Sequence, residues 1–262
     1  MVKKNKVNKV NANKVNANKL YFLILIIFII ISIYYAIEFT EDLTTINTRT
    51  IETDGFCVLY NEFYCDTTSY PCKKLQNDVL NLLPDNYVFI DYVYKIKNVA
   101  LSTFHRDVTS SKNIYKTNYP VYTLILYKYD GELLSVCPGS NKTYPFVWSN
   151  ILNIDGKKGT AFLFDCDLLH AGRVNYCKYR EVIQYKLCHH SDLKKLEHLQ
   201  GINKTKSEEC VMSFKNICIR KLSYYMEFPI NYFFYPFMIK RENSNSFIGF
   251  IQSFIPITYY NN

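Results

Sequence analysis

The chain has 262 residues and a formal net charge of +8, with 48% hydrophobic and 21% charged residues. Six lysines and no acid lie in residues 1–19, which leaves 25 basic against 23 acidic residues in the rest of the chain. The basic balance therefore belongs to the N-terminal tail, and we expect no nucleic-acid binding by the folded part.

The tail itself is polar and repetitive, with NKVNA occurring twice between Asn8 and Ala17. Such low-complexity sequence buries too little apolar surface to offset the entropy lost on ordering. The composition therefore predicts a disordered segment over residues 1–19.

An uncharged apolar segment follows, LYFLILIIFIIISIYYAI, from Leu20 to Ile37. Its 18 residues nearly span a hydrocarbon core of about 30 Å. The run is apolar on every face and no A-x-A-like site follows it, which favours a membrane anchor over a buried helix or a signal peptide. Lysines precede the run and acids follow it, so the positive-inside rule predicts a single-pass, type II signal-anchor. The tail would be cytosolic, and the rest lumenal or extracellular.

All nine cysteines lie beyond this segment. An oxidising lumen would permit disulfides among them, and their odd number leaves at least one thiol unpaired within a monomer.

Residues 38–50 are expected to form a short stalk, followed by a mainly β domain over 51–200. After a first short strand in DGFCVLYNEF, Thr68 or Ser69 can cap a helix that ends at Pro84. The apolar face of this helix is Leu75, Val79, Leu82 and Leu83.

From Tyr87 onward, runs of β-branched and aromatic residues alternate with turn-forming residues. The runs are VFIDYVYKI, PVYTLILYKY, ELLSVC, TAFLFDCDLLH and EVIQYKLCHH. Several short strands at this spacing predict a sandwich, barrel or jelly roll. LKKLEHLQG predicts a short closing helix, and the aromatic-rich extension 201–262 is expected to pack against the domain.

The segment TFHRDVTSSKN, residues 103–113, carries the first motif with chemical meaning. His-Arg-Asp also occurs in protein-kinase catalytic loops, but Asn113 is one position too late and the other kinase motifs are missing from the sequence. In an extended strand, His105 and Asp107 point to one face and Arg106 to the other. The pair can therefore supply two ligands of a non-haem iron, whose facial triad needs one further histidine.

His170 is the best candidate for that histidine, because it ends GTAFLFDCDLLHAG, the strongest buried-strand pattern in the chain. The other three histidines lie in or beside the polar segment HHSDLKKLEH, and we interpret them as surface residues: His189, His190 and His198. Arg180 opens the next strand, ten residues after His170, where its fork can bind the far carboxylate of 2-oxoglutarate. Arg173 lies in the turn and is the second choice. Alternation along the strand predicts one face formed by Arg180, Val182, Gln184 and Lys186.

These segments together resemble the 2-oxoglutarate/Fe(II)-dependent dioxygenase superfamily, especially its phytanoyl-CoA dioxygenase-like branch. The resemblance covers roughly residues 54–190 and rests on four segments in order: HRD, GELLSVCPGSN, LLHAGRVN and YREVIQYKL. It implies a double-stranded β-helix, also called a jelly roll, with flanking helices. It implies Fe(II) bound by His105, Asp107 and His170, which form the catalytic centre, and 2-oxoglutarate anchored by Arg180. The implied reaction consumes O₂ and hydroxylates a C–H bond, with ascorbate as a possible reductant.

Where the family has P-G-S-H, this chain has Pro138-Gly-Ser-Asn141, and the second cosubstrate contact has no match upstream. The substrate stays open between a polypeptide and a small molecule. Two other readings are also open: a catalytically inactive jelly-roll binding or structural membrane protein, and a metal enzyme of the same fold that does not use 2-oxoglutarate.

The charge pattern around Leu20–Ile37 yields a test of topology. In sealed microsomes, protease added outside is expected to remove the lysine-rich tail and to spare the domain, because the domain would lie in the lumen. An epitope tag at each end, followed by immunoblotting, reports the two fates. Digestion of the domain with survival of the tail would refute the orientation.

Overall fold

The computed structural model describes residues 19–31, 37–41, 46–66, 70–99, 101–175, 179–207 and 213–227. The chain divides into two compact units, Met1–Ile37 and Glu38–Asn262. The first unit contains a helix over residues 19–31, whose apolar side chains from Leu20 to Ile31 are exposed. Across the described ranges, no helix is both long and apolar enough to cross a bilayer. Residues 32–36 of the predicted anchor, and 1–18 of the predicted tail, lie outside the described residues.

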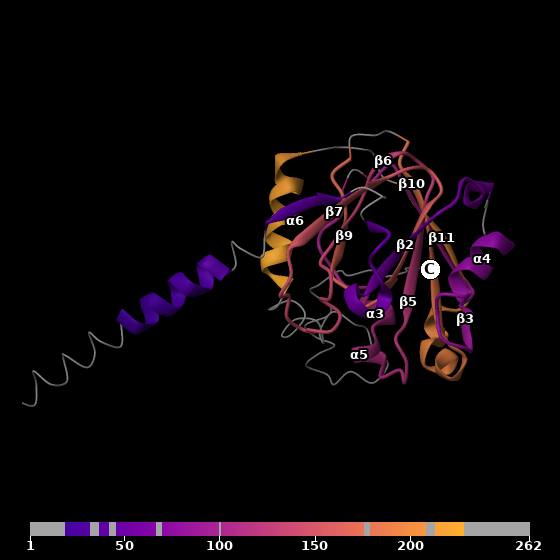
Figure 1. Cartoon of the computed structure of the whole chain (residues 1–262), viewed down its shortest axis with the longest axis horizontal. Coiled ribbons are helices and arrows are strands. Elements are labelled where there is room, and N and C mark those ends of the chain that lie inside the picture. The colour runs from indigo at the N-terminus through magenta and orange to yellow at the C-terminus, as the bar shows by residue number, and fades with distance from the viewer. Residues whose placement is uncertain are drawn as a thin grey trace, which may run out of the picture. The chain divides into compact units, whose positions relative to one another are not determined.

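The second unit is mainly β and contains two sheets (Figure 1). The larger sheet has seven strands, and six of them follow the order β11-β4-β10-β5-β8-β2 while β3 pairs with β10. Its strands are β2 (Phe56–Tyr60), β3 (Tyr87–Phe89), β4 (Tyr92–Lys97), β5 (Tyr122–Tyr127), β8 (Thr160–Asp165), β10 (Glu181–His189) and β11 (Ile202–Ser207). All but β11 coincide with apolar runs that predict strands, because each run places β-branched or aromatic side chains on a buried face.

The smaller sheet has four strands in the order β1-β7-β6-β9. They are β1 (Glu38–Glu41), β6 (Gly131–Val136), β7 (Ile151–Gly156) and β9 (His170–Gly172). Residues 38–50, expected to be a stalk, thus contribute a strand that pairs in parallel with β7. Asn153 of β7 donates to Glu38 at 2.8 Å, and Arg49 forms ion pairs with Glu41 and Asp54. These polar contacts attach the expected stalk to the domain.

The apolar core lies between the two sheets. Its buried side chains come from β6 and β7 on one side and from β5, β8 and β10 on the other, including Leu134, Ile154, Ile125, Phe162 and Val182. Two sheets that share one core, with helices on their outer faces, form a jelly-roll-like arrangement. A second cluster covers the outer face of the large sheet, where helix α4 packs through Leu75 and Val79.

The helices are short: α3 (Ile51–Asp54), η1 (Glu62–Asp66), α4 (Lys73–Leu80), η2 (Val108–Ser110), α5 (Lys112–Tyr115), η3 (His190–Leu199) and α6 (Phe214–Tyr225). Helix α4 begins after Cys72 rather than at the predicted caps Thr68 and Ser69, which lie outside the described residues. Leu82 is exposed because α4 ends at Leu80, two residues before it, so it does not join the predicted apolar face. The predicted closing helix is the 3₁₀ segment η3.

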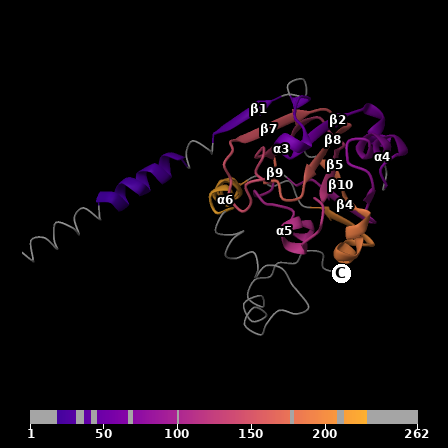
Figure 2. The same ribbon diagram turned by 60° about the horizontal axis from the view of Figure 1, so that its bottom comes forward.

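The described part of the C-terminal extension packs on the domain. Strand β11 adds to the edge of the large sheet beside β4, and helix α6 lies on the side of β7 and β9, opposite α4 (Figures 1 and 2). Arg220 of α6 donates to the Ser102 carbonyl at 2.7 Å, and Glu227 accepts from Arg106 Nε at 2.6 Å. The extension therefore holds the segment that carries the His-Arg-Asp motif. Residues 228–262 lie outside the described residues.

The Arg106–Glu227 pair predicts a large loss of stability on substitution. Both side chains are at most 3% exposed, so Glu227→Ala leaves a buried guanidinium without its counter-charge. We expect the free energy of unfolding to fall by about 3 kcal/mol or more, measured by urea denaturation. Glu181→Ala is the matched control, because its pair with Lys97 is partly exposed and should contribute no more than about 1 kcal/mol. Equal losses for the two variants would contradict the prediction.

Candidate metal centre

The backbone brings the two halves of the predicted triad together. His105 and His170 form an isolated antiparallel bridge, with amide-to-carbonyl distances of 2.9 and 3.0 Å. Two residues further on, the Asp107 amide donates to the Cys166 carbonyl at 2.8 Å. The predicted strand over residues 105–107 is not formed: His105 makes only a bridge, and Asp107 has φ −76° and ψ 71°, because the Val108 amide donates to the Arg106 carbonyl at 2.8 Å and η2 begins directly afterwards.

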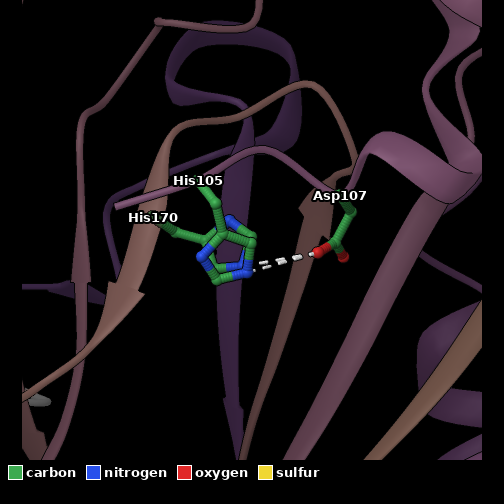
Figure 3. A group of neighbouring side chains, drawn as sticks. All are labelled: His105, Asp107 and His170. Atoms are coloured by element: carbon green, nitrogen blue, oxygen red, sulfur yellow. Dashed lines mark ion pairs between the residues drawn. The ribbon is translucent and has the colours of Figure 1, made fainter. Parts of the chain in front are cut away.

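The three side chains converge on one point (Figure 3). Nε2 of His105 lies 3.8 Å from Asp107 Oδ1, and Nε2 of His170 lies 3.6 Å from the same oxygen. One ligand atom from each residue lies within 4.8 Å of the others. Atoms that bind one ion at about 2.1 Å can be at most about 4.2 Å apart, so both distances to Asp107 suit a shared metal.

Hydrogen bonds fix which nitrogen of each imidazole is available. Nδ1 of His105 lies 2.8 Å from the Thr103 carbonyl oxygen, and Nδ1 of His170 lies 3.0 Å from that of Leu168. A carbonyl oxygen can only accept, so each Nδ1 carries a proton, and in the neutral form of each ring the lone pair is on Nε2. The Nε2 atoms of both histidines face Asp107, while each Nδ1 donates to a backbone carbonyl. Metal-binding histidines commonly have this arrangement, in which the second ring nitrogen donates to an acceptor.

The electrostatics of the site favour the protonation states that a metal requires. Burial, the largest effect, opposes ionisation of Asp107, but Lys186 and the two imidazoles together hold its pKa below the ordinary value. Burial and the neighbouring His105 lower the pKa of His170 to about 4, against the attraction of Asp107. Near pH 7 the site therefore offers an ionised carboxylate and a neutral His170 imidazole.

The sequence analysis placed Lys186 on the same face of β10 as Arg180 but assigned it no function. Its ammonium lies 2.6 Å from Asp107 Oδ2, 2.7 Å from Thr123 Oγ1 and 2.9 Å from Ser110 Oγ. The predicted alternation along β10 is correct, because Arg180, Val182 and Gln184 line the central cavity while Ile183, Tyr185 and Leu187 join the outer cluster. That alternation was the only sequence signal that pointed to Lys186.

A cavity of about 260 Å³ opens in front of the triad. His105, Asp107 and His170 lie in its wall together with Arg180. Apolar and aromatic side chains from β4, β5, β6 and β10 form much of the remainder, including Tyr94, Ile96, Ile125, Tyr127, Leu134 and Val182. The cavity is therefore a chamber of mixed polar and apolar lining, with a metal-type ligand set and the cation of Arg180 in its wall.

Arg180 is buried with 5% of its surface exposed. It donates to the carbonyls of Val99 at 3.0 Å and Arg173 at 2.9 Å, and no salt bridge to it occurs within the described ranges. Gly172 makes room for the guanidinium, because a Cβ there would lie 2.6 Å from Nη2 of Arg180. Arg173 already pairs with Asp155, so Arg180 is the better anchor for an anionic ligand.

The remaining predicted features lie away from the ligand set. His190 and His198 are exposed, and His189 is partly buried with its ring stacked on Tyr119. In the Pro138-Gly-Ser-Asn141 segment, Ser140 Oγ accepts from the Leu169 amide at 2.8 Å and its carbonyl accepts from Arg106. This segment therefore supports both backbone stretches that carry the triad.

The low pKa of His170 makes the stability of the metal-free protein depend on pH. Between pH 6.5 and 4, His170 binds a proton in the unfolded chain but stays neutral in the folded protein. The free energy of unfolding therefore falls as the pH falls through this window. At pH 5 the loss attributable to His170 is roughly 2 kcal/mol. Urea denaturation of the chelator-treated protein at pH 7 and pH 5 measures it. His170→Gln should lose less stability than the wild type over the same interval, and an equal loss would count against the assignment.

Comparison with known proteins gives no sequence relative: no family model matches the chain, and no curated protein does. Among solved structures, the chain resembles EvdMO1 at 16% identity and a TM-score of 0.35, covering 44% of this chain and only 30% of that one. It resembles the non-heme alpha ketoglutarate dependent epimerase SnoN from nogalamycin biosynthesis at 11% identity and a TM-score of 0.40, covering 56% and 82%. HygX from Streptomyces hygroscopicus matches at 11% identity and a TM-score of 0.38, covering 52% and 83%. TM-scores below 0.5 establish neither a shared fold nor a shared activity, so function is inferred from the site alone.

Proposed function

We propose that this chain is an Fe(II)- and 2-oxoglutarate-dependent dioxygenase. The observation that carries the proposal is the joint presence of a two-histidine, one-carboxylate ligand set and a buried arginine in the wall of one cavity. The reaction needs both the ligand set and the arginine, because 2-oxoglutarate binds the metal through its keto-acid end and a cation through its far carboxylate.

The ligand set suits a divalent first-row metal that keeps open positions. Two neutral imidazoles and one carboxylate on one side of an ion are typical of non-haem Fe(II) oxygenases. Four protein ligands would instead favour a closed structural site. Iron supplies the oxidative chemistry when bound: O₂ and 2-oxoglutarate are converted to succinate and CO₂, and one oxygen atom enters a substrate C–H bond as hydroxyl.

The chain's own residues orient and shelter the reactants. Arg180 has no carboxylate partner among the described residues, so the far carboxylate of 2-oxoglutarate would supply its counter-charge. Ile125, Leu134 and Val182 form apolar wall beside the ligands and limit the access of water. The carbonyls of Thr103 and Leu168, which fix the Nδ1 protons, would keep the Nε2 atoms of His105 and His170 available as ligands of an ion.

The phytanoyl-CoA dioxygenase-like branch is the finer assignment that we propose within this superfamily. It is supported by the sequence segments around Pro138 and His170 and by the ten-residue spacing from His170 to Arg180. The substrate is a polypeptide or small molecule that presents one group to the cavity, because a volume of about 260 Å³ lies below the roughly 300 Å³ at which pockets for drug-sized ligands begin.

We also propose that residues 20–37 anchor the enzyme as a single-pass, type II membrane protein with its catalytic domain lumenal or extracellular. The support is the uncharged 18-residue run, preceded by lysines, and the exposure of its apolar side chains over residues 20–31. The anchor would confine the enzyme to secreted or membrane-borne substrates.

Turnover without the native substrate tests the proposed reaction. The full-length protein, supplied with Fe(II), ascorbate, 2-oxoglutarate and O₂, is expected to release succinate, and His105→Ala should abolish the release. Arg180→Ala should raise the dissociation constant for 2-oxoglutarate by tenfold to a hundredfold while retaining iron, because it removes a charge-assisted contact to the cosubstrate and no ligand. Calorimetric titration of the iron-loaded or Mn(II)-loaded protein measures this constant.

Arg173→Ala and His190→Ala are the matched controls. Arg173 pairs with Asp155 and His190 is exposed, so neither change should alter cosubstrate affinity or succinate release by more than about twofold. If the metal-loaded wild type neither binds 2-oxoglutarate nor releases succinate, the proposed reaction is wrong, and the chain is either a metal enzyme that does not use 2-oxoglutarate or a non-catalytic binding or structural protein. Succinate release by the metal-loaded enzyme with unchanged affinity in Arg180→Ala would exclude Arg180 as the anchor.

A further inference from the structure

Asp107 is bound from behind by a lysine that takes no part in the cavity wall. Lys186 is 2% exposed and lies on β10, and it is not among the described residues that line the chamber. Its ammonium is 2.6 Å from Asp107 Oδ2. The carboxylate thus lies between the metal position on one side and a fixed cation on the other.

The two oxygens of Asp107 are used differently. Oδ2 accepts from Lys186 and from the hydroxyl of Thr123. Oδ1 is the atom that faces both histidine Nε2 atoms, at 3.8 and 3.6 Å. Chelation of an ion by both oxygens would require Oδ2 to give up its ion pair with Lys186, whose other close contacts, Thr123 and Ser110, are uncharged hydroxyls. The contacts therefore favour metal binding through Oδ1 alone.

The buried charge has a second effect, on affinity. A lysine ammonium and a divalent ion both attract Asp107, and they repel each other across a distance set by one carboxylate. Before a metal binds, Lys186 already compensates the charge of Asp107, so the ion gains less by binding there than it would from an unpaired carboxylate.

We propose that Lys186 competes with the metal for Asp107, restricting the carboxylate to one-oxygen ligation and lowering the affinity of the centre for divalent ions. The benefit of this restriction rests on the proposed function. Ligation by a single oxygen of Asp107 would leave coordination positions free for the two donor atoms of 2-oxoglutarate and for O₂. The inference itself concerns metal binding and does not require turnover.

Replacing Lys186 with the neutral, similarly long methionine tests the competition. Co(II) is the probe, because it resists oxidation and its visible absorption reports coordination. In the full-length, chelator-treated protein, Lys186→Met is expected to tighten the dissociation constant for Co(II) by tenfold or more, because the metal then replaces the missing cation. The Co(II) spectrum of the variant should also differ from that of the wild type, since Oδ2 becomes free to bind.

A purely structural role for Lys186 predicts the opposite sign, because a damaged site binds metal more weakly. Lys194→Met, an exposed lysine on η3, is the matched control and should leave the constant unchanged. If Lys186→Met does not fold without metal, saturating Co(II) should restore its thermal transition. Unchanged or weaker binding, or failure of Co(II) to restore folding, would overturn the proposal.

The same titration separates this inference from the proposed function. If the wild type does not bind Co(II), the proposed metal centre is wrong, and the proposed dioxygenase function is wrong with it. Normal wild-type binding combined with no tightening in Lys186→Met would reject only the competition by Lys186.

Discussion

The candidate centre depends on one backbone pairing, between His105 and His170. Residues that exchange both hydrogen bonds in an antiparallel pair lie directly opposite, with their side chains on the same face. The two imidazoles accordingly have ring centroids 4.5 Å apart, although 65 positions separate them in sequence. Because β9 begins at His170 and pairs with β6, this bridge also attaches the His-Arg-Asp segment to the small sheet. The convergence of the candidate ligands and the attachment of the His-Arg-Asp segment to the small sheet therefore follow from the same contact.

Buried charge is the second constraint on the molecule. Arg106, Asp107, Arg180 and Lys186 lie on or beside the cavity wall, where an unpaired charge is costly. Asp107 and Lys186 compensate each other, and Arg106 is compensated by Glu227. Arg180 is satisfied by carbonyl groups that carry no net charge. This imbalance makes Arg180 the position where an anion from outside the chain would be most stabilising.

Much of the architecture could be predicted from the sequence because runs of β-branched and aromatic residues mark most strands of the large sheet. The strands that escaped prediction, β1, β7, β9 and β11, have weaker signals, and β11 (INKTKS) is almost entirely polar. In β7 the polar residues Asn153 and Asp155 interrupt the apolar ones, and β9 has only three residues. Strand β1 begins at Glu38, directly after the apolar run 20–37, so its residues were interpreted as a stalk. The partners of β1 and β9 lie far along the chain, so local pattern could not reveal their pairing.

The site was predictable to the level of residue type and face. The pair His105 and Asp107 was predicted from a period of two, His170 from its place at the end of a buried-strand pattern, and Arg180 from its place at the start of the next strand. The structure brings the first three together and places Arg180 in the wall of the same cavity. The contacts of Lys186 could not be predicted in this way, since its partner Asp107 is 79 positions away. Nor could spacing alone separate Arg180 from Arg173, because the deciding residue, Asp155, reaches Arg173 only through the fold.

The pairing of Arg106 with Glu227 orders events during synthesis of the protein. These residues are 121 positions apart, and Glu227 leaves the ribosome long after all three ligands have emerged. Until it arrives, a guanidinium flanked by two ligands lacks the carboxylate that it binds at 2.6 Å. Domains generally complete their packing only once all contributing segments are available. The surroundings of the candidate ligand set are therefore expected to be complete only after helix α6 and Glu227 have been synthesised and have docked.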